Sequence, residues 1–229
     1  MERLDKILAG RGLGTRHEVR ALVKRRLVTV DGEVVRDFGL KVDPAADIRF
    51  QGDPVAAIPV LVLFHKPSGV VSTMDDDWGR TSLVGALPER WEGRLHPVGR
   101  LDADTTGLLL FSADGQITQR LLHPRRGIER EYRATVEGAP DPSLVDRLAA
   151  GIETAEGLAC ARVTHIEADE VRLVVTEGKH RMVRRMLANA GHPVLALHRV
   201  RYGEVHLGAL PEGEVREATP EELAWARGG

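Results

Sequence analysis

Residues 99–111 read Gly-Arg-Leu-Asp-Ala-Asp-Thr-Thr-Gly-Leu-Leu-Leu-Phe, a polar loop that runs directly into an apolar segment. The apolar residues 107–111 predict a strand buried on both faces, because such a strand needs no polar alternation. Polar side chains beside a buried strand are well placed to act, since the strand holds the loop rigidly. Asp102 and Asp104 are therefore candidate functional carboxylates, with turn capping as the alternative role for either one.

On both sides of this segment, strands and helices follow one another without a regular rhythm. Apolar runs predict strands at 60–64, 132–136 and 171–176. Helices are expected over 116–122, over 180–190 before Gly191, and after the capping box at Thr219. This mixture favours an α+β domain over residues 61–229, built on a mostly antiparallel mixed sheet.

The N-terminal residues predict a second, smaller unit of helices and strands. A capping box of Thr15 and Glu18 opens one of two short helices, and the turn Asp31-Gly32 joins two short strands. Residues 47–50 are expected to close the small sheet. We expect a small α/β domain over residues 1–52 and a linker over 53–60, because the stretch 52–59 begins with Gly52 and contains Pro54 and Pro59.

The composition argues against several classes of protein. Hydrophobic residues make up 42% of the 229 residues, which is ordinary for a globular chain, and no apolar run is long enough to span a membrane. The charged N-terminus is unlike a signal peptide, so we expect a cytoplasmic protein with no membrane partner. The single cysteine, Cys160, excludes an internal disulfide and a cysteine-rich zinc site.

Motifs for cofactors and metals are missing from the sequence. There is no Gly-rich dinucleotide fingerprint and no phosphate loop, and the nine histidines show no paired-ligand spacing. Asp75-Asp76-Asp77 lacks the spacing of a calcium loop, so we expect an exposed acidic turn there. The sequence therefore predicts neither a cofactor nor a metal.

The charge is unevenly distributed along a chain whose net charge is only −2. Residues 1–26 hold eight Lys or Arg and three Asp or Glu, a net charge of +5, and residues 177–201 hold six and one, again +5. Two basic islands in a nearly neutral protein indicate a surface that binds a polyanion, with a solvated helix face as the alternative for each island.

Several segments, in this order along the chain, resemble motifs of the RNA pseudouridine synthases, in particular the bacterial RsuA-type enzymes that act on ribosomal RNA. The segments are Lys66-Pro67-Ser68-Gly69, Gly99-Arg100-Leu101-Asp102 with Thr105-Thr106-Gly107, Arg130-Glu131-Tyr132, Gly178-Lys179-His180-Arg181-Met182-Val183-Arg184 and His198-Arg199-Val200-Arg201-Tyr202-Gly203. The N-terminal unit resembles an S4-like RNA-binding domain. The sequence departs from the family pattern at His65, where asparagine is usual, and at Met182, where glutamine is common.

The resemblance implies a role for individual residues. Asp102 would be the catalytic carboxylate, Tyr132 would pack against the target uracil, and Arg184 would pair with Asp102 and keep it ionised. The basic residues near the site would contact RNA phosphates: Arg100, Lys179, Arg181 and Arg185. In the N-terminal domain the candidate phosphate contacts are Arg3, Lys6, Arg16, Arg20, Lys24, Arg25 and Arg26.

The expected reaction is the cofactor-independent isomerisation of a specific uridine in ribosomal RNA to pseudouridine. The expected partner is ribosomal RNA or a ribosomal subunit precursor, bound by a monomer. The segment Asp104-Thr105-Thr106-Gly107 and the pair His198-Arg199 slightly favour small-subunit RNA as the substrate, with large-subunit RNA as the alternative. Two other classes stay open on the sequence: a non-catalytic ribosome-assembly protein, and a glycoside-cleaving enzyme that would use Asp104 as its second carboxylate.

Overall fold

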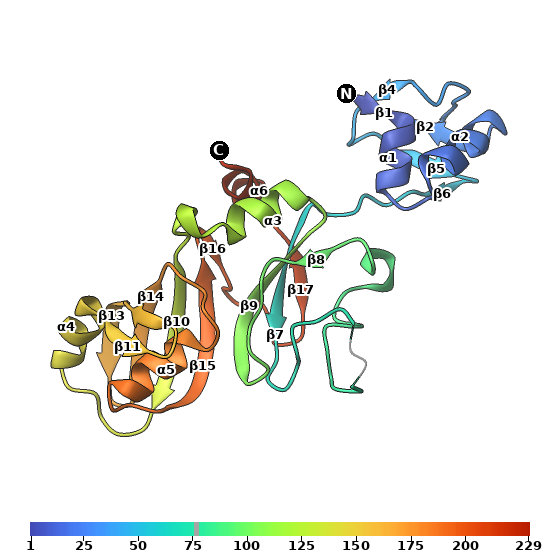
Figure 1. The fold of residues 1–229 in the computed structure, drawn as a ribbon. Helices are drawn as coiled ribbons and strands as arrows, with labels where there is room; N and C mark the ends of the chain where they lie inside the picture. The colour runs from blue at the N-terminus through green and yellow to red at the C-terminus, as the bar shows by residue number, and fades with distance from the viewer. Residues whose placement is uncertain (76–77) are drawn as a thin grey trace. The chain divides into compact units, whose positions relative to one another are not determined.

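The structure is a computed structural model that describes residues 1–75 and 78–229. The chain divides into two compact units, Met1–Ile58 and Pro59–Gly229. Figure 1 shows both units, each with its own helices and sheet. Asp76 and Asp77 of the expected acidic turn lie outside the described residues.

The first unit packs two short helices against a small antiparallel sheet. The helices are α1 (Leu4–Gly10) and α2 (Arg16–Lys24), and the predicted capping box of Thr15 and Glu18 is present at the start of α2. Within the described residues, one sheet has the strand order β3-β2-β5-β6 and the other joins β1 to β4. These strands are β1 (Glu2–Arg3), β2 (Val28–Val30), β3 (Glu33–Val34), β4 (Lys41–Val42), β5 (Ile48–Phe50) and β6 (Asp53–Pro54).

The expected linker starts too early. Asp53–Pro54 forms β6 and pairs with β5, and Val55 is buried with Leu4, Ile48 and the other apolar residues of the first unit. This strand and Val55 therefore belong to the first unit, which ends at Ile58 rather than at residue 52.

The second unit is built on one large sheet, which confirms the expected α+β class. In the described part of the chain the strand order is β13-β14-β10-β15-β9-β7-β17, with β16 added to β15 and β8 to β9. The strands are β7 (Leu61–Lys66), β8 (His96–Pro97), β9 (Thr105–Ser112), β10 (Arg130–Val136), β13 (Arg162–Glu167), β14 (Glu170–Val175), β15 (Val194–Tyr202), β16 (Val205–His206) and β17 (Val215–Glu217).

Helices and a hairpin complete the second unit (Figure 1). The elements are α3 (Gly115–Leu122), α4 (Ser143–Ala150), the hairpin β11 (Ile152–Thr154) and β12 (Gly157–Ala159), α5 (Met182–Asn189), α6 (Pro220–Arg227) and the short 3-10 helices η1 (Glu89–Trp91) and η2 (Pro124–Arg126). The capping box at Thr219 is present, and Gly191, just beyond α5, has a left-handed φ of 92°. Apolar residues of α3 and α6 pack with those of β7 and β9 in one cluster.

The pairing of β9 with β15 holds the two halves of the sheet together. It is parallel, whereas the other pairings in the described sheet are antiparallel. Gly107 lies opposite Arg199 in this pairing and has φ +104°; a Cβ there would lie 2.3 Å from the Arg199 carbonyl oxygen. A side chain cannot be accommodated, so this glycine allows β9 and β15 to approach.

Candidate active site

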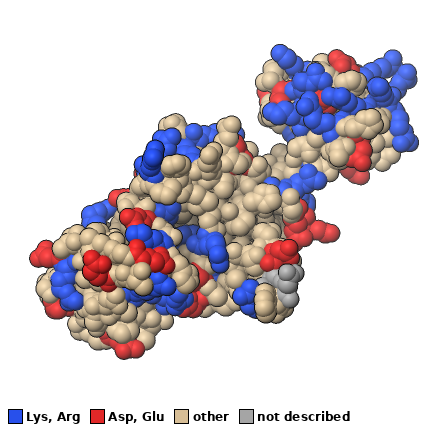
Figure 2. All heavy atoms as spheres, in the orientation of Figure 1, with Lys and Arg blue, Asp and Glu red and all other residues tan. Residues whose placement is uncertain are grey.

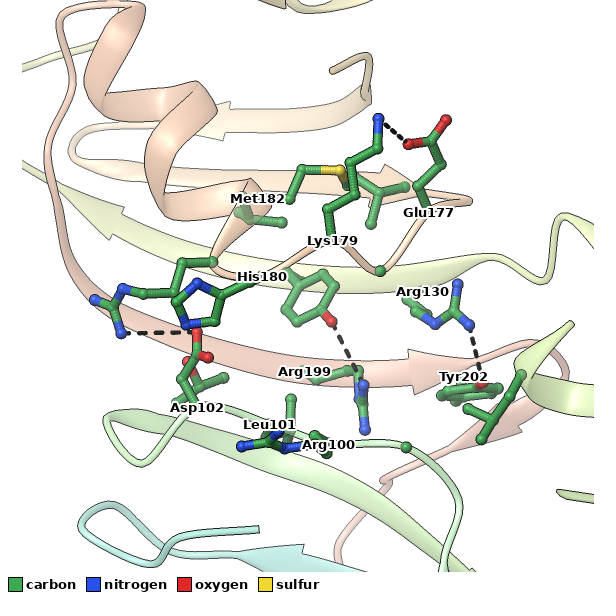
Figure 3. A pocket seen from close by; sticks show the side chains of 18 of the residues that line it. Arg100, Leu101, Asp102, Arg130, Glu177, Lys179, His180, Met182, Arg199 and Tyr202 are labelled. Atoms are coloured by element: carbon green, nitrogen blue, oxygen red, sulfur yellow. Dashed lines mark hydrogen bonds and ion pairs between the residues drawn. The ribbon is translucent and has the colours of Figure 1, made fainter. Parts of the chain in front are cut away.

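A cavity of about 890 Å³ opens in the second unit, beside the central strands of its sheet. Its walls come from the loop before β9, the start of β10, the end of β15 and the segment that leads into α5. Figure 3 shows that Asp102 and Leu101 lie across this space from Lys179 and Met182. Of the predicted site residues, the cavity is lined by Arg100, Asp102, Tyr132, Lys179 and Arg181.

Asp102 sits in a loop whose backbone is held on both sides. The Ser72 hydroxyl donates to the Leu101 carbonyl (2.7 Å) and accepts from the Leu101 amide (3.0 Å). On the other side, the Ala103 carbonyl accepts from the Gly69 amide (2.8 Å). The Asp102 side chain is 25% exposed, so its carboxylate stays reachable while its backbone is fixed.

Lys66 is the second support of this loop, and it is completely buried. Its ammonium group donates to the carbonyls of Val70 (2.7 Å), Pro67 (2.9 Å) and Ala103 (3.2 Å). Burial lowers the pKa of Lys66 to about 8, against the opposing attraction of the Asp104 and Asp102 carboxylates. The buried lysine therefore ties the Lys66–Val70 turn to the residue that follows Asp102.

Tyr132 lies on β10 and reaches the cavity from within the sheet, where it is 9% exposed. The Arg199 guanidinium donates to its hydroxyl (3.5 Å) and to the Leu108 carbonyl (2.7 Å). Arg130 donates to the Tyr202 hydroxyl (3.0 Å), and both arginines lie over the Tyr202 ring. The floor of the cavity thus combines aromatic rings with two buried cations (Figure 3).

Among the described ion pairs, Arg184 is paired with Asp104 and not with the predicted Asp102. Arg184 is buried and its guanidinium donates to the Asp104 carbonyl (2.7 Å), to Thr105 Oγ1 (3.4 Å) and to the Val194 carbonyl (3.3 Å). Its ion pair is with the Asp104 carboxylate, at 3.4 Å. Arg184 therefore braces the end of the loop from α5, one residue beyond Ala103, and does not line the cavity.

Arg181 is the cation nearest to the Asp102 carboxylate among the described ion pairs, at 3.8 Å. It also makes two parallel hydrogen bonds to Asp104, both 3.1 Å. Burial opposes ionisation of Asp104, but the hydrogen bonds from Arg181 and the charge of Arg184 outweigh it and lower the pKa of Asp104. Asp104 is thus a charged bridge between the loop and the two arginines, and Asp102 is the carboxylate of this loop that faces the cavity.

The remaining predicted RNA contacts near the site lie at its rim or outside it. Arg100 is exposed, and Lys179 pairs with Glu177 at 2.8 Å. Arg185 pairs with Glu156 at 2.8 Å and does not line the cavity.

The predicted contacts in the N-terminal unit fall into two sets. Arg3, Arg16 and Arg20 surround the carboxylate of Asp5. The others lie apart from it: Lys6 pairs with Glu2, Lys24 lies over the Phe38 ring, and Arg25 and Arg26 are exposed.

Sequence reasoning assigned no role to four buried polar residues that build these sites: Asp5, Lys66, Arg130 and Arg199. Lys66, Arg130 and Arg199 stand within the motif segments quoted above, whereas the signal for Asp5 is the charge pattern alone. A charged residue stands inside or beside an apolar, element-forming run, where burial without a partner would be costly. Such a pattern indicates that the charged residue has a partner in the folded protein, but it does not identify that partner.

Comparisons with known proteins agree with this architecture. Residues 60–189 match the family model described as RNA pseudouridylate synthase, and residues 2–48 match that of the S4 domain. The chain is 38% identical to the ribosomal large subunit pseudouridine synthase B of Bacillus subtilis, over 97% of this chain and 94% of the relative. It is also 38% identical to the ribosomal small subunit pseudouridine synthase A of Yersinia pestis, over 97% of each. A crystal structure of a pseudouridylate synthase superposes with a TM-score of 0.68 at 30% identity, covering 99% of this chain and 100% of the other.

No group of three or more His, Cys, Asp or Glu in residues 1–75 and 78–229 could hold a metal ion. No helix in that part of the chain has both the length and the apolar character needed to cross a membrane.

Proposed function

The chain belongs to the RNA pseudouridylate synthase family, and on that premise we propose that it converts a uridine of ribosomal RNA to pseudouridine with Asp102 as the catalytic carboxylate. The observation that carries this proposal is the position of Asp102. Its backbone is clamped by Ser72, Lys66 and Gly69, while its carboxylate faces a cavity that also contains Tyr132.

The reaction is an isomerisation and balances without any co-substrate. The bond between uracil N1 and ribose C1′ breaks, a bond between C5 and C1′ forms, the proton of C5 is lost, and N1 gains a proton. A carboxylate suits this chemistry because it can act as a nucleophile or stabilise positive charge as a glycosidic bond breaks. Asp102 supplies that group, and no step needs a cofactor or a metal.

Tyr132 provides the surface for the uracil. The base must leave its stack to reach Asp102, and stacking on an aromatic ring recovers roughly 1–3 kcal/mol. The hydrogen bond from Arg199 to the Tyr132 hydroxyl fixes the ring from behind. Arg181 forms the ion pair with the Asp102 carboxylate, at 3.8 Å, that was expected of Arg184.

Ribosomal RNA as the substrate, in a subunit precursor or free, is supported by the relatives that cover nearly the whole chain. Relatives named for the large and for the small subunit are each 38% identical, so the slight preference of the sequence for small-subunit RNA receives no further support. We propose that the protein acts on one of these RNAs as a monomer in the cytoplasm.

Mapping of pseudouridines tests this proposal. Both large- and small-subunit ribosomal RNA would be mapped in cells with and without the gene. We expect one site, in one of the two RNAs, to lose its pseudouridine. Identical maps from the two strains would contradict the proposal, and release of free uracil from RNA by the purified protein would favour the glycoside-cleaving alternative.

A further inference from the structure

A carboxylate is buried in the middle of the basic surface of the first unit. Asp5, in the first turn of α1, has a fully buried side chain, although the residues around it are mainly positive. Figure 2 shows Lys and Arg spread over the visible face of this unit. A buried carboxylate under a surface that is expected to bind an anion requires an explanation, because its charge works against that binding.

Three arginines converge on this one carboxylate. Arg3 donates to both oxygens (3.1 and 3.2 Å), Arg16 shares one nitrogen between them (3.2 and 3.3 Å), and Arg20 donates to Oδ2 (3.0 Å). The hydrogen bond from Arg3 and then those from Arg20 and Arg16 outweigh the burial of Asp5 and hold its pKa well below the ordinary value. Asp5 is therefore ionised, and the cluster of four residues carries a net charge of +2.

Asp5 holds the three arginines in place but leaves them with exposed surface and with N–H donors that it does not engage. Their side chains remain 45%, 52% and 41% exposed, for Arg3, Arg16 and Arg20 respectively, while Asp5 is 0% exposed. A guanidinium has five N–H donors, and Asp5 engages at most two nitrogen atoms of each one. The Phe38 ring, 5.0 Å from the Arg20 guanidinium carbon, limits the movement of that side chain further.

We propose that Arg3, Arg16 and Arg20 form a single binding site for a phosphodiester of the RNA backbone, and that Asp5 is its positioning residue. Free arginine side chains lose rotamer freedom when they bind, and this loss weakens each contact. Because Asp5 binds the three arginines in the folded protein, much of their rotamer freedom is already lost before RNA binds, and the three guanidinium groups are already gathered in one place. The inference rests on the proposed function, since it assumes that the ligand is RNA.

The substitution Asp5→Asn distinguishes this role from simple electrostatics. It removes a negative charge, so charge alone predicts tighter RNA binding. Positioning predicts the opposite: the arginines are released, the affinity for RNA falls by about tenfold, and the salt dependence of binding becomes shallower. The matched control is Glu2→Gln, which removes an acidic charge from the same unit and so frees Lys6 from its ion pair. This variant should bind RNA at least as tightly as the parent protein.

The measurement is the affinity of the full-length protein for a mixed-sequence RNA hairpin over a series of salt concentrations, with thermal unfolding of each variant recorded beside it. Weaker binding of a folded Asp5→Asn protein, together with unchanged or tighter binding of Glu2→Gln, supports the proposal. Equal or tighter binding of Asp5→Asn overturns it.

The substitutions Arg3→Gln, Arg16→Gln and Arg20→Gln keep the proposal testable if Asp5→Asn fails to fold. A shared site predicts a large loss for each single variant and little further loss for the triple variant, whereas losses that simply add overturn the single site. RNA binding is measured separately from pseudouridine formation. A negative binding result would therefore not contradict the proposed reaction, and an unchanged pseudouridine map would not contradict the phosphodiester site.

Discussion

The position of Asp102 depends on residues that hold the backbone and side chains on either side of it. The Leu101 and Ala103 backbone on either side of it is fixed by Ser72 and Lys66, and the next residue, Asp104, is held by Arg181 and Arg184. Positioning of this kind is worth a great deal in catalysis, because a small displacement of a reacting group lowers the rate steeply. The loop is therefore held firmly, and of its two carboxylates Asp102 is the one that lines the cavity.

Lys66 gives this loop a dependence on pH. The folded protein loses the Lys66 proton at a pH of about 8, whereas the unfolded chain keeps it up to the ordinary value of 10.5. Between these values the folded state binds fewer protons, so the contribution of this group to stability rises with pH. The neutral amine has one fewer N–H to donate to the three carbonyls, so we expect the catalytic rate to fall through a pH of about 8 while stability does not fall.

The pH profile of single-turnover rates measures this effect. Lys66→Met, which lacks the titrating group, should be slower than the parent and should lack the falling limb near pH 8. A limb of the same midpoint in both proteins would assign it to another group.

At the scale of elements, the parallel contact between β9 and β15 brings Asp102 and Tyr132 into one site. The loop of Asp102 precedes β9, Tyr132 lies on β10, and β15 lies between the two strands. Arg199 of β15 bonds to both neighbours, through the Leu108 carbonyl and the Tyr132 hydroxyl. The spacing between Asp102 and Tyr132 therefore depends on how closely β9 approaches β15.

Gly107→Ala tests this approach. The added methyl group would lie 2.3 Å from the Arg199 carbonyl oxygen, at a φ that alanine rarely adopts, so the two strands must separate. We expect the free energy of unfolding to fall by about 2–4 kcal/mol and activity to fall with it, as measured by denaturant titration and turnover.

Gly115→Ala is the matched control for this change. Gly115 lies at the first position of α3, where a Cβ would meet nothing within 4 Å. Alanine there should leave activity intact and raise stability by up to about 1 kcal/mol. A Gly107→Ala protein as stable as the parent would show that the close approach is not required.

The elements that the sequence predicted correctly are those with strong local signals. The capping boxes at Thr15 and Thr219 and the apolar run of β9 depend only on neighbours in the chain. The strand β13 was missed because it lies at the edge of the sheet and carries mostly exposed side chains, so it has no apolar pattern. The helix α4 was missed although Leu144 and Leu148 have helical spacing and are buried.

The site was predictable in part for the same reason. Asp102 and Tyr132 lie within motifs that can be read locally, and both line the cavity. The partner of Arg184 depends instead on how α5 packs against a loop about eighty residues earlier, and a displacement of two residues along that loop exchanges Asp102 for Asp104. Sequence spacing does not determine which of two nearby carboxylates a distant arginine reaches.

At the scale of the whole molecule, the chain combines a basic RNA-binding unit with a catalytic unit. Each unit has a separate hydrophobic core, centred on Leu4, Leu8 and Val19 in the first and on Leu63, Leu108 and Tyr202 in the second. Separate cores indicate that the units fold independently.

Deleting residues 1–58 should therefore leave a folded catalytic unit that binds RNA more weakly and with a shallower salt dependence, since phosphate contacts are lost. Circular dichroism and RNA affinity at several salt concentrations measure the two expectations. If the affinity for RNA were unchanged at every salt concentration, the first unit would have no part in RNA binding.

The most direct test of Asp102 as the catalytic carboxylate is the single-turnover rate of Asp102→Asn on the ribosomal RNA identified by mapping. The change keeps the shape of the side chain and removes its charge, so RNA binding and folding should persist. We expect the rate to fall by at least about 10³-fold, on the scale seen when a covalent or charge-stabilising group is removed. Asp104→Asn, which changes the neighbouring carboxylate, should retain measurable turnover. Pseudouridine formed by Asp102→Asn at the parent rate would contradict the account.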